Sequence, residues 1–259
     1  MFYPEHVLYN SNDQYRQQEE LHMTGLGTLI NAAAILAGGI LGLTFGKFMK
    51  PRYQETLTMA CGVSVIFLGI AGTMEKMMTV TAQGLVSGGT MMIIGSFVLG
   101  SLLGEWMNIE QHLEEFGGWL KRKTGSSRDH RFVDGFVTAS LTVCIGAMAV
   151  VGAIQDGIYG DYSILLAKAA LDFIIILVMG ASMGKGCLFS AVPVGLFQGS
   201  VTLLARLIEP FMTEGALDNL SLTGSMLIFC VGVNLLWGKK VKVANMLPAL
   251  LIAVIWALR

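Results

Sequence analysis

The stretch YSILLAKAALDFIIILVMGASM, residues 162–183, decides the fold class of this chain. It is long enough and apolar enough to cross a bilayer, because a helix needs about 20 residues to span a hydrocarbon core of about 30 Å. Two charged residues interrupt it, Lys168 and Asp172, four positions apart and therefore on one face of a helix. We expect an all-α integral membrane protein in which one span carries two charges.

Seven further stretches of similar length and composition accompany it. Hydrophobic residues make up 54% of the chain and charged residues 14%, against about 25% charged residues in a typical soluble domain. The last two stretches are short, and a re-entrant element is the alternative to a span at either place. The sequence thus predicts a polytopic membrane helix bundle of about eight transmembrane helices, at 24–46, 56–74, 86–104, 133–154, 162–183, 187–208, 222–238 and 241–258.

The chain divides into a polar start and one apolar domain. Residues 1–22 contain no apolar run, which predicts a disordered N-terminal extension, and 23–259 are expected to form a single transmembrane domain. Within that domain, 107–121 places apolar residues at helical spacing and charged residues on the other face. This predicts an amphipathic helix between the third and fourth spans, lying either on the membrane surface or against the protein itself.

Two apolar segments resemble each other. CGVSVIFLGIAG (61–72) in the second span and GSMLIFCVGVNL (224–235) in the seventh are expected to cross in opposite directions. Helices 1–3 and 6–8 are therefore a possible inverted repeat, a common plan in transporters. Chance similarity between two short apolar segments is the alternative.

The distribution of Lys and Arg predicts the orientation. Twelve of them fall in or beside alternate loops, within 47–52, 121–131 and 239–242 and at Lys185, and only four lie on the other side. Basic residues are retained in cytoplasmic loops. We therefore expect both termini to lie outside the cytoplasm.

Polar residues inside the spans are the candidate functional residues, because they carry a desolvation cost that lipid does not repay. Asp172 lies too deep for its short side chain to reach water beyond the membrane, and a purely structural pair with Lys168 is the alternative to a functional one. Pro193 in the sixth span removes a backbone donor and frees a carbonyl one turn earlier. The expected ion or substrate pathway is charged at its centre and lined by neutral oxygens: Asp172, Lys168, Asn31, Thr138, Thr142, Ser190 and Gln198.

Several functional classes find no support. The net charge of −1 gives no reason to expect a nucleic-acid partner. All four histidines lie outside the predicted spans, and the chain has neither a G-x-S-x-G elbow nor a phosphate loop. We expect no enzyme activity and no cofactor, and the sequence leaves metal binding open. The expected partners are the lipid bilayer and a small cation or proton, with a homo-oligomer possible.

Five segments of the sequence resemble those of a known protein family. They are GTLINAAAILAGG (27–39), GFVTASLTVCIGAMAVVGAIQDGIYGD (135–161), LFSAVPV (188–194), QGSVTLLA (198–205) and NMLPALL (245–251). Together they resemble a bacterial family catalogued as domain of unknown function 554, over roughly residues 24–259. The resemblance implies a multi-pass protein in the plasma (inner) membrane of a prokaryote. It hints at ion transport and supplies no established site residues.

Three functions remain open. The first is a transporter or channel for a small ion, the second a transporter of a small polar organic solute, and the third a non-transporting scaffold or regulator. Polar groups within the spans favour the first two. Flux measured in liposomes against a panel of cations and solutes discriminates among them.

The predicted orientation is testable by thiol labelling in intact cells, with the four native cysteines removed. Cysteines introduced in the loop 121–131 should be shielded from a membrane-impermeant reagent, because that loop is expected in the cytoplasm. Cysteines introduced at 157–160 should be labelled. The reverse pattern would overturn the orientation.

Overall fold

The computed structural model describes residues 24–82, 84–126 and 129–258. The predicted extension 1–22 lies outside the described residues. Helices dominate the described chain: α2 (Leu26–Phe48), α3 (Pro51–Met77), α4 (Thr90–Met107), α5 (Ile109–Lys123), α6 (Phe132–Cys144), α7 (Ala147–Tyr159), α8 (Ser163–Met183), α9 (Ala191–Leu203), α10 (Ala205–Ile208), α11 (Glu214–Trp237) and α12 (Pro248–Ala257). Three short 3-10 turns complete them: η1 (Lys185–Ser190), η2 (Glu209–Phe211) and η3 (Ala244–Met246).

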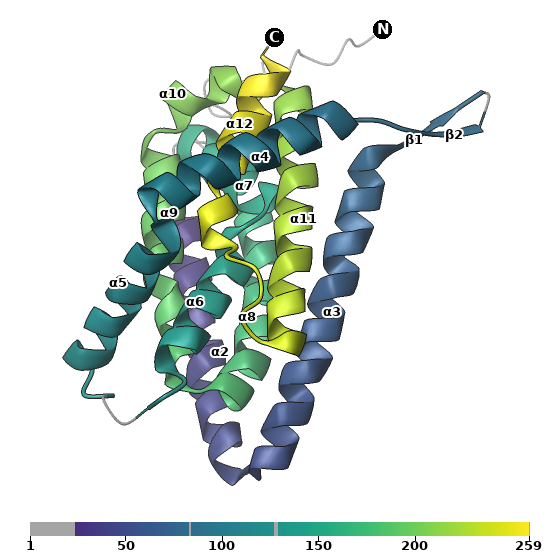
Figure 1. Cartoon of the computed structure of the whole chain (residues 1–259). Coiled ribbons are helices and arrows are strands. Elements are labelled where there is room, and N and C mark those ends of the chain that lie inside the picture. The colour runs from purple at the N-terminus through teal and green to yellow at the C-terminus, as the bar shows by residue number, and fades with distance from the viewer. Residues whose placement is uncertain (1–23, 83, 127–128, 259) are drawn as a thin grey trace, which may run out of the picture.

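Within the described ranges, six helical segments are long and apolar enough to cross a membrane, or seven if the bent pair α6–α7 counts as one span. A shorter apolar helical segment, Ala244–Ala257, follows them. These segments form one bundle, and the beginning of α2 lies at the same end of it as the end of α12 (Figure 1). The all-α polytopic bundle predicted from the sequence is therefore confirmed.

Glycines allow the closest helix pair in the bundle. A Cβ atom added to Gly38, Gly42 or Gly46 of α2 would fall within 3.0 Å of a backbone carbonyl oxygen of α8. The three carbonyls follow in the same order along α8, so the two helices run parallel. Small residues at four-residue spacing let helix backbones approach in lipid, where dispersion contacts replace the hydrophobic effect. This stripe brings α2 against the helix that carries Lys168 and Asp172.

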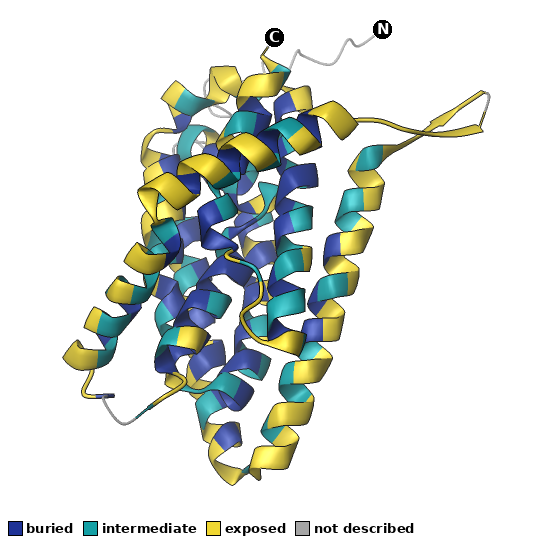
Figure 2. Ribbon diagram, in the orientation of Figure 1, coloured by how far each residue is buried: buried dark blue, intermediate teal, exposed yellow. Residues whose placement is uncertain are grey.

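The buried residues gather in the middle of the bundle and the exposed ones lie on its outside (Figure 2). Many of the exposed residues are large and apolar. Phe67 on α3 and Leu102 on α4 are 65% exposed in the isolated chain. This is the arrangement of a protein whose outer surface is solvated by lipid rather than water.

The fourth predicted span differs from expectation. A single helix was expected over 133–154, but α6 ends at Cys144 and α7 begins at Ala147 with a bend of 63°. Gly146, at the break, has φ +148° and ψ 148°, a conformation that L residues with a side chain rarely adopt. The apolar composition continues through the break, which is why the pattern predicted one helix.

Two other segments also differ. Strands β1 (Met78–Thr81) and β2 (Gly84–Ser87) pair antiparallel ahead of α4, in a register that places Met78 opposite Ser87. This hairpin projects beyond the bundle (Figure 1), whereas a helix was expected to begin at residue 86. Pro193 lies in the first turn of α9, where a proline is tolerated, and so it does not interrupt the helix.

The amphipathic segment forms α5, and its apolar residues pack on the protein. The rings of Phe116 and Phe136 lie 5.8 Å apart, Leu120 is buried, and Gly117 lies against Phe136. This helix therefore packs against its own bundle, and its place relative to the membrane surface stays a prediction.

The α2–α8 contact yields a test of stability. Gly42→Val should destabilise the protein by about 1–3 kcal/mol, because the added side chain would overpack the interface. Thermal unfolding of the purified protein in detergent measures the change. Gly195→Ala is the matched control, since a Cβ there would meet nothing within 4 Å. Equal melting temperatures for Gly42→Val and the wild type would contradict the tight α2–α8 interface.

Candidate functional site

The break between α6 and α7 leaves a backbone carbonyl without its helical partner. In a continuous helix the Val143 carbonyl would accept a hydrogen bond from the amide of Ala147, but residues 145 and 146 leave the helix. The Lys168 ammonium donates to this carbonyl instead, at 2.7 Å. The last carbonyls of a helix carry a partial negative charge, so a cation there is favourable.

Lys168 also forms an ion pair within its own helix. Its Nζ atom lies 2.5 Å from Oδ2 of Asp172, one turn further along α8. The two residues are 6% and 3% exposed. Burying two charges carries a desolvation penalty, which the mutual attraction and the additional hydrogen bonds offset. The site is therefore close to neutral, and the ammonium has two partners, the Val143 carbonyl and the Asp172 carboxylate.

Two amide side chains extend this site toward α2 and α9. Asn31 and Gln198 have no exposed surface, and Nδ2 of Asn31 donates to Oε1 of Gln198 at 3.2 Å. The Asn31 side chain also lies near the Asp172 carboxylate. Four of the predicted pathway residues, Asp172, Lys168, Asn31 and Gln198, thus meet in one cluster, the ionic centre, which joins α2, α8 and α9 to the end of α6.

The other three predicted pathway residues lie differently. Thr142 donates its hydroxyl to the Thr138 carbonyl at 2.8 Å, and Ser190 donates to the Cys187 carbonyl at 2.7 Å. Both hydroxyls therefore bond within their own helical segment rather than to the charges. Thr138 lines a separate cavity. The structure therefore does not bring all seven predicted pathway residues together in one site.

Asp156 near the end of α7 is a functional candidate that the sequence reasoning did not choose. It has no exposed surface, and its Oδ2 atom accepts a hydrogen bond from the Gly27 amide at 3.2 Å. The carboxylate therefore caps the first turn of α2, where unpaired amides and the helix dipole favour a negative charge. An acidic residue near the end of an apolar helix was the available signal, but its partner lies far away in the sequence.

A cavity of about 560 Å³ lies between α3, α5, α6 and α11. Its charged lining residues are Glu55, Glu110, Glu114, Arg131, Asp134 and Lys239. Along α6 the lining extends from Asp134 to Leu141, two residues before the carbonyl that holds Lys168. The cavity therefore ends close to the ionic centre, with α6 as the wall between them.

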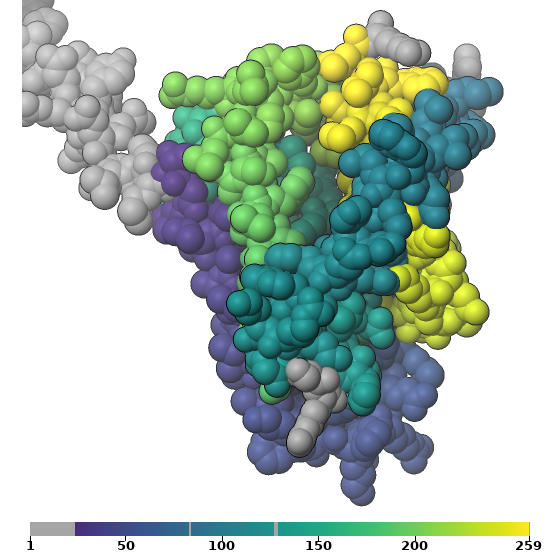
Figure 3. All heavy atoms as spheres, turned by 60° about the vertical axis from the view of Figure 1, so that its left-hand side comes forward, coloured from purple at the N-terminus to yellow at the C-terminus, as the bar shows by residue number. Residues whose placement is uncertain are grey.

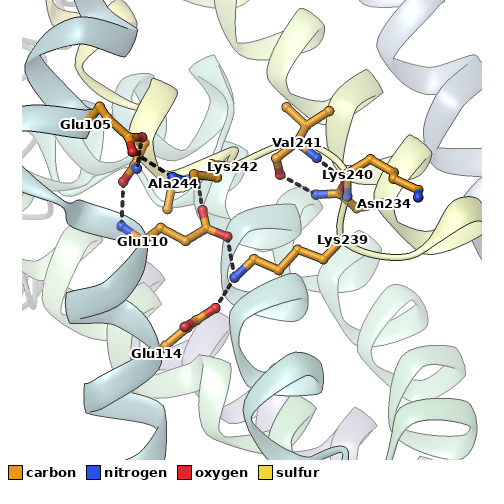
Figure 4. Close-up of polar contacts among 10 residues, drawn as sticks. Glu105, Glu110, Glu114, Asn234, Lys239, Lys240, Val241, Lys242 and Ala244 are labelled. Atoms are coloured by element: carbon orange, nitrogen blue, oxygen red, sulfur yellow. Dashed lines mark hydrogen bonds and ion pairs between the residues drawn. The ribbon is translucent and has the colours of Figure 1, made fainter.

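A network of ion pairs and amide contacts holds the segment between α11 and α12 beside this cavity (Figure 4). Lys239 forms ion pairs with Glu110, at 2.9 Å, and with Glu114. Oε2 of Glu110 accepts from the Ala244 amide at 3.0 Å, and the Glu110 amide donates to Oδ1 of Asn245 at 2.7 Å. The start of α5 is thereby fixed to the segment that precedes α12.

Asn234 shapes the turn that leads into this segment (Figure 4). Its Oδ1 atom accepts from the amides of Lys240 and Val241, both at 2.9 Å, and its Nδ2 donates to the Val241 carbonyl at 2.7 Å. The amide group thus satisfies backbone groups past the end of α11. Within the described ranges, no three His, Cys, Asp or Glu side chains come together as a metal-binding group.

Comparisons with known proteins agree over nearly the whole chain. The family model described as protein of unknown function (DUF554) matches residues 26–258. The uncharacterized membrane protein YdfK of Bacillus subtilis (strain 168) is 31% identical over 226 residues, which cover 87% of this chain and 93% of YdfK. The uncharacterized protein YqgA of Escherichia coli (strain K12) is 28% identical over 232 residues, covering 88% of this chain and 94% of YqgA. No solved structure matches. The chain is therefore a multi-pass membrane protein that belongs to the DUF554 family.

Proposed function

We propose that this protein is a transporter or channel for a small ion and that the ion passes through the ionic centre. The observation that carries the proposal is the buried Lys168–Asp172 pair, held on the free carbonyl of a broken helix in the interior of the bundle. Broken helices at membrane depth are found where they are buried in protein or line a pathway, and transporters commonly build their ion sites from them.

The cost of burying two charges favours a functional role for the Lys168–Asp172 pair. Apolar residues of similar volume often replace a buried ion pair without loss of stability, so the pair is weak evidence for a structural role. In a bilayer, ionisable residues in the protein interior mark ion pathways and proton relays by default. Lys168 and Asp172 fit that description because they are buried inside the bundle, bonded to α6 and close to Asn31 of α2.

The contacts of the pair suggest how ion binding is coupled to movement. Asp172 is held by Lys168, while Lys168 has a second partner in the Val143 carbonyl. A cation or proton that reaches Asp172 competes with Lys168, which then relies on the carbonyl alone. Because the Val143 carbonyl lies in the last turn of α6, this competition changes the contacts at the break between α6 and α7.

The cavity supports an entrance from one side. It is lined by the beginning of α3 and by residues that flank the Lys- and Arg-rich loops. We assign this end to the cytoplasm by the distribution of basic residues, in the plasma membrane of a prokaryote. The charged lining also suits a small polar organic solute as an alternative cargo, which the solute arm of a flux panel tests.

Removing the pair tests the function. Lys168→Met with Asp172→Leu should yield folded protein, because the apolar pair removes the desolvation cost. Flux of cations and protons into proteoliposomes should fall to the level of empty liposomes. The single variant Asp172→Asn should be less stable than the double variant, since it leaves the Lys168 charge without its carboxylate.

The matched control is an exposed ion pair on the same protein. Lys76 and Asp218 lie 2.9 Å apart, with side chains 30% and 58% exposed. Lys76→Met with Asp218→Leu should leave flux unchanged. Wild-type flux in the Lys168→Met, Asp172→Leu variant would show that the buried pair is structural.

A further inference from the structure

A second group of polar atoms lies on the side of the ionic centre away from the cavity. Within the described part of the chain, five buried side-chain atoms have no hydrogen-bond partner. All five come from α2, α7 and α9, which pack against one another. They are Thr28 Oγ1, Asn31 Oδ1, Asp156 Oδ1, Gln198 Nε2 and Thr202 Oγ1. Unpartnered buried polar atoms are rare and each carries a cost, so five on three neighbouring helices require a physical reason.

These five atoms, called the polar file below, lie between the carboxylates of Asp156 and Asp172. Thr28 and Asn31 are one turn apart on α2, and Gln198 and Thr202 are one turn apart on α9. Asp156 bonds the first turn of α2 through Gly27, and its neighbour Gly157 lies against the carbonyl of Thr202. Asn31, which bonds Gln198 and lies near Asp172, connects the file to the ionic centre.

The file reaches the end of the bundle opposite the cavity. Asp156 lies one turn before the end of α7 at Tyr159, beside the beginning of α2. The beginning of α2 and the end of α9 lie at the same end of the molecule (Figure 3). The polar file therefore leads from this end toward Asp172.

The orientation of the amides indicates what the file holds. Nδ2 of Asn31 donates to Oε1 of Gln198, which leaves Oδ1 of Asn31 as an acceptor without a protein partner. Nε2 of Gln198 is then left as a donor. The file thus mixes donors with acceptors, and its two hydroxyls serve as either. Water satisfies such a mixed set, whereas a dehydrated metal cation would face the Gln198 donor.

We propose that this file is a hydrated proton relay that joins Asp156 to Asp172. The inference rests on the proposed function and names its ion as the proton. Asp156, which is buried in this structure, takes up a proton when water reaches it from its end of the bundle and releases a proton to the waters of the file. These pass it to the Asp172 carboxylate, which becomes a neutral acid and loses its ion pair with Lys168. The proton later leaves Asp172 toward the cavity side, and the Lys168 pair forms again. Only O–H bonds form and break, and no charge is left behind.

Proton flux through purified variants tests the relay. The wild-type protein is placed in liposomes loaded with a pH-sensitive dye, and an acid jump with a potassium and valinomycin clamp drives proton entry. Asp156→Asn keeps an oxygen to accept from Gly27 but cannot carry a proton. It should lower the flux by about 100-fold, the order of a positioned acid–base group. Asp156→Glu should retain a measurable part of the flux.

Two further variants keep the test decisive. Thr202→Val preserves shape but removes a hydroxyl from the file without touching the α2 cap, so it should lower proton flux while leaving the melting temperature near that of the wild type. Asp161→Asn is the control, because that carboxylate lies on the exposed turn before α8, where it accepts from the Ser163 amide at 2.9 Å. It should leave the flux unchanged.

The outcomes separate the relay from the proposed function. A wild-type protein that moves sodium or potassium but not protons overturns the relay and leaves ion transport standing. The same holds if Asp156→Asn and Thr202→Val carry protons at the wild-type rate. A wild-type protein that moves no ion under any gradient contradicts the proposed function and the relay together.

Discussion

The Lys168 ammonium is the interaction on which the interior of this protein depends. It bonds a carbonyl in the last turn of α6 and the carboxylate of Asp172 at once. Removing the ammonium alone would leave the Val143 carbonyl without this partner and Asp172 without its counter-ion, inside a bundle where unsatisfied polar groups are costly. At the 63° bend between α6 and α7, this contact replaces a helical hydrogen bond. The break and the charge pair are therefore one feature, and a change in one acts on the other.

Close helix packing determines which groups surround that ammonium. The glycine stripe of α2 draws its backbone onto α8, and the same approach places Asn31 against the carboxylate of α8 and the amide of Gln198 on α9. Asp156 secures the first turn of α2 from α7. The interior thus has two differently built halves. On one side a cavity ends near α6, and on the other a file of buried polar atoms reaches the end of the bundle. In the function proposed above, the cavity and the polar file would give the central charge pair access from the two ends of the bundle.

The parts of this arrangement that depend on local pattern could be predicted from the sequence. Apolar length predicted the membrane bundle, and the four-residue spacing of Lys168 and Asp172 predicted their pairing. Asn31 was identified because packing alone does not need an amide among glycines. The break at Gly146 could not be predicted, because the residues on either side remain apolar and only the backbone dihedral angles change. The role of Asp156 was equally out of reach, since its bond to Gly27 spans 129 positions and depends on how α7 meets α2. Thr142 and Ser190 were chosen for their oxygens, yet a hydroxyl on a helix readily donates to its own backbone one turn earlier, as both do here.

The central claim is that the Lys168–Asp172 pair changes partners when an ion passes. Solid-state NMR of the protein in liposomes, with the lysine Nζ atoms labelled with nitrogen-15, measures this most directly, and the spectrum of Lys168→Met assigns the signal. The account predicts that the Lys168 signal shifts between conditions that load Asp172 with the transported ion and conditions that leave it empty, as the ammonium moves from two partners to the Val143 carbonyl alone. Under the same conditions the signal of Lys76, whose exposed pair takes no part, should stay fixed. A Lys168 signal that does not change while the same liposomes conduct the ion would contradict the claim.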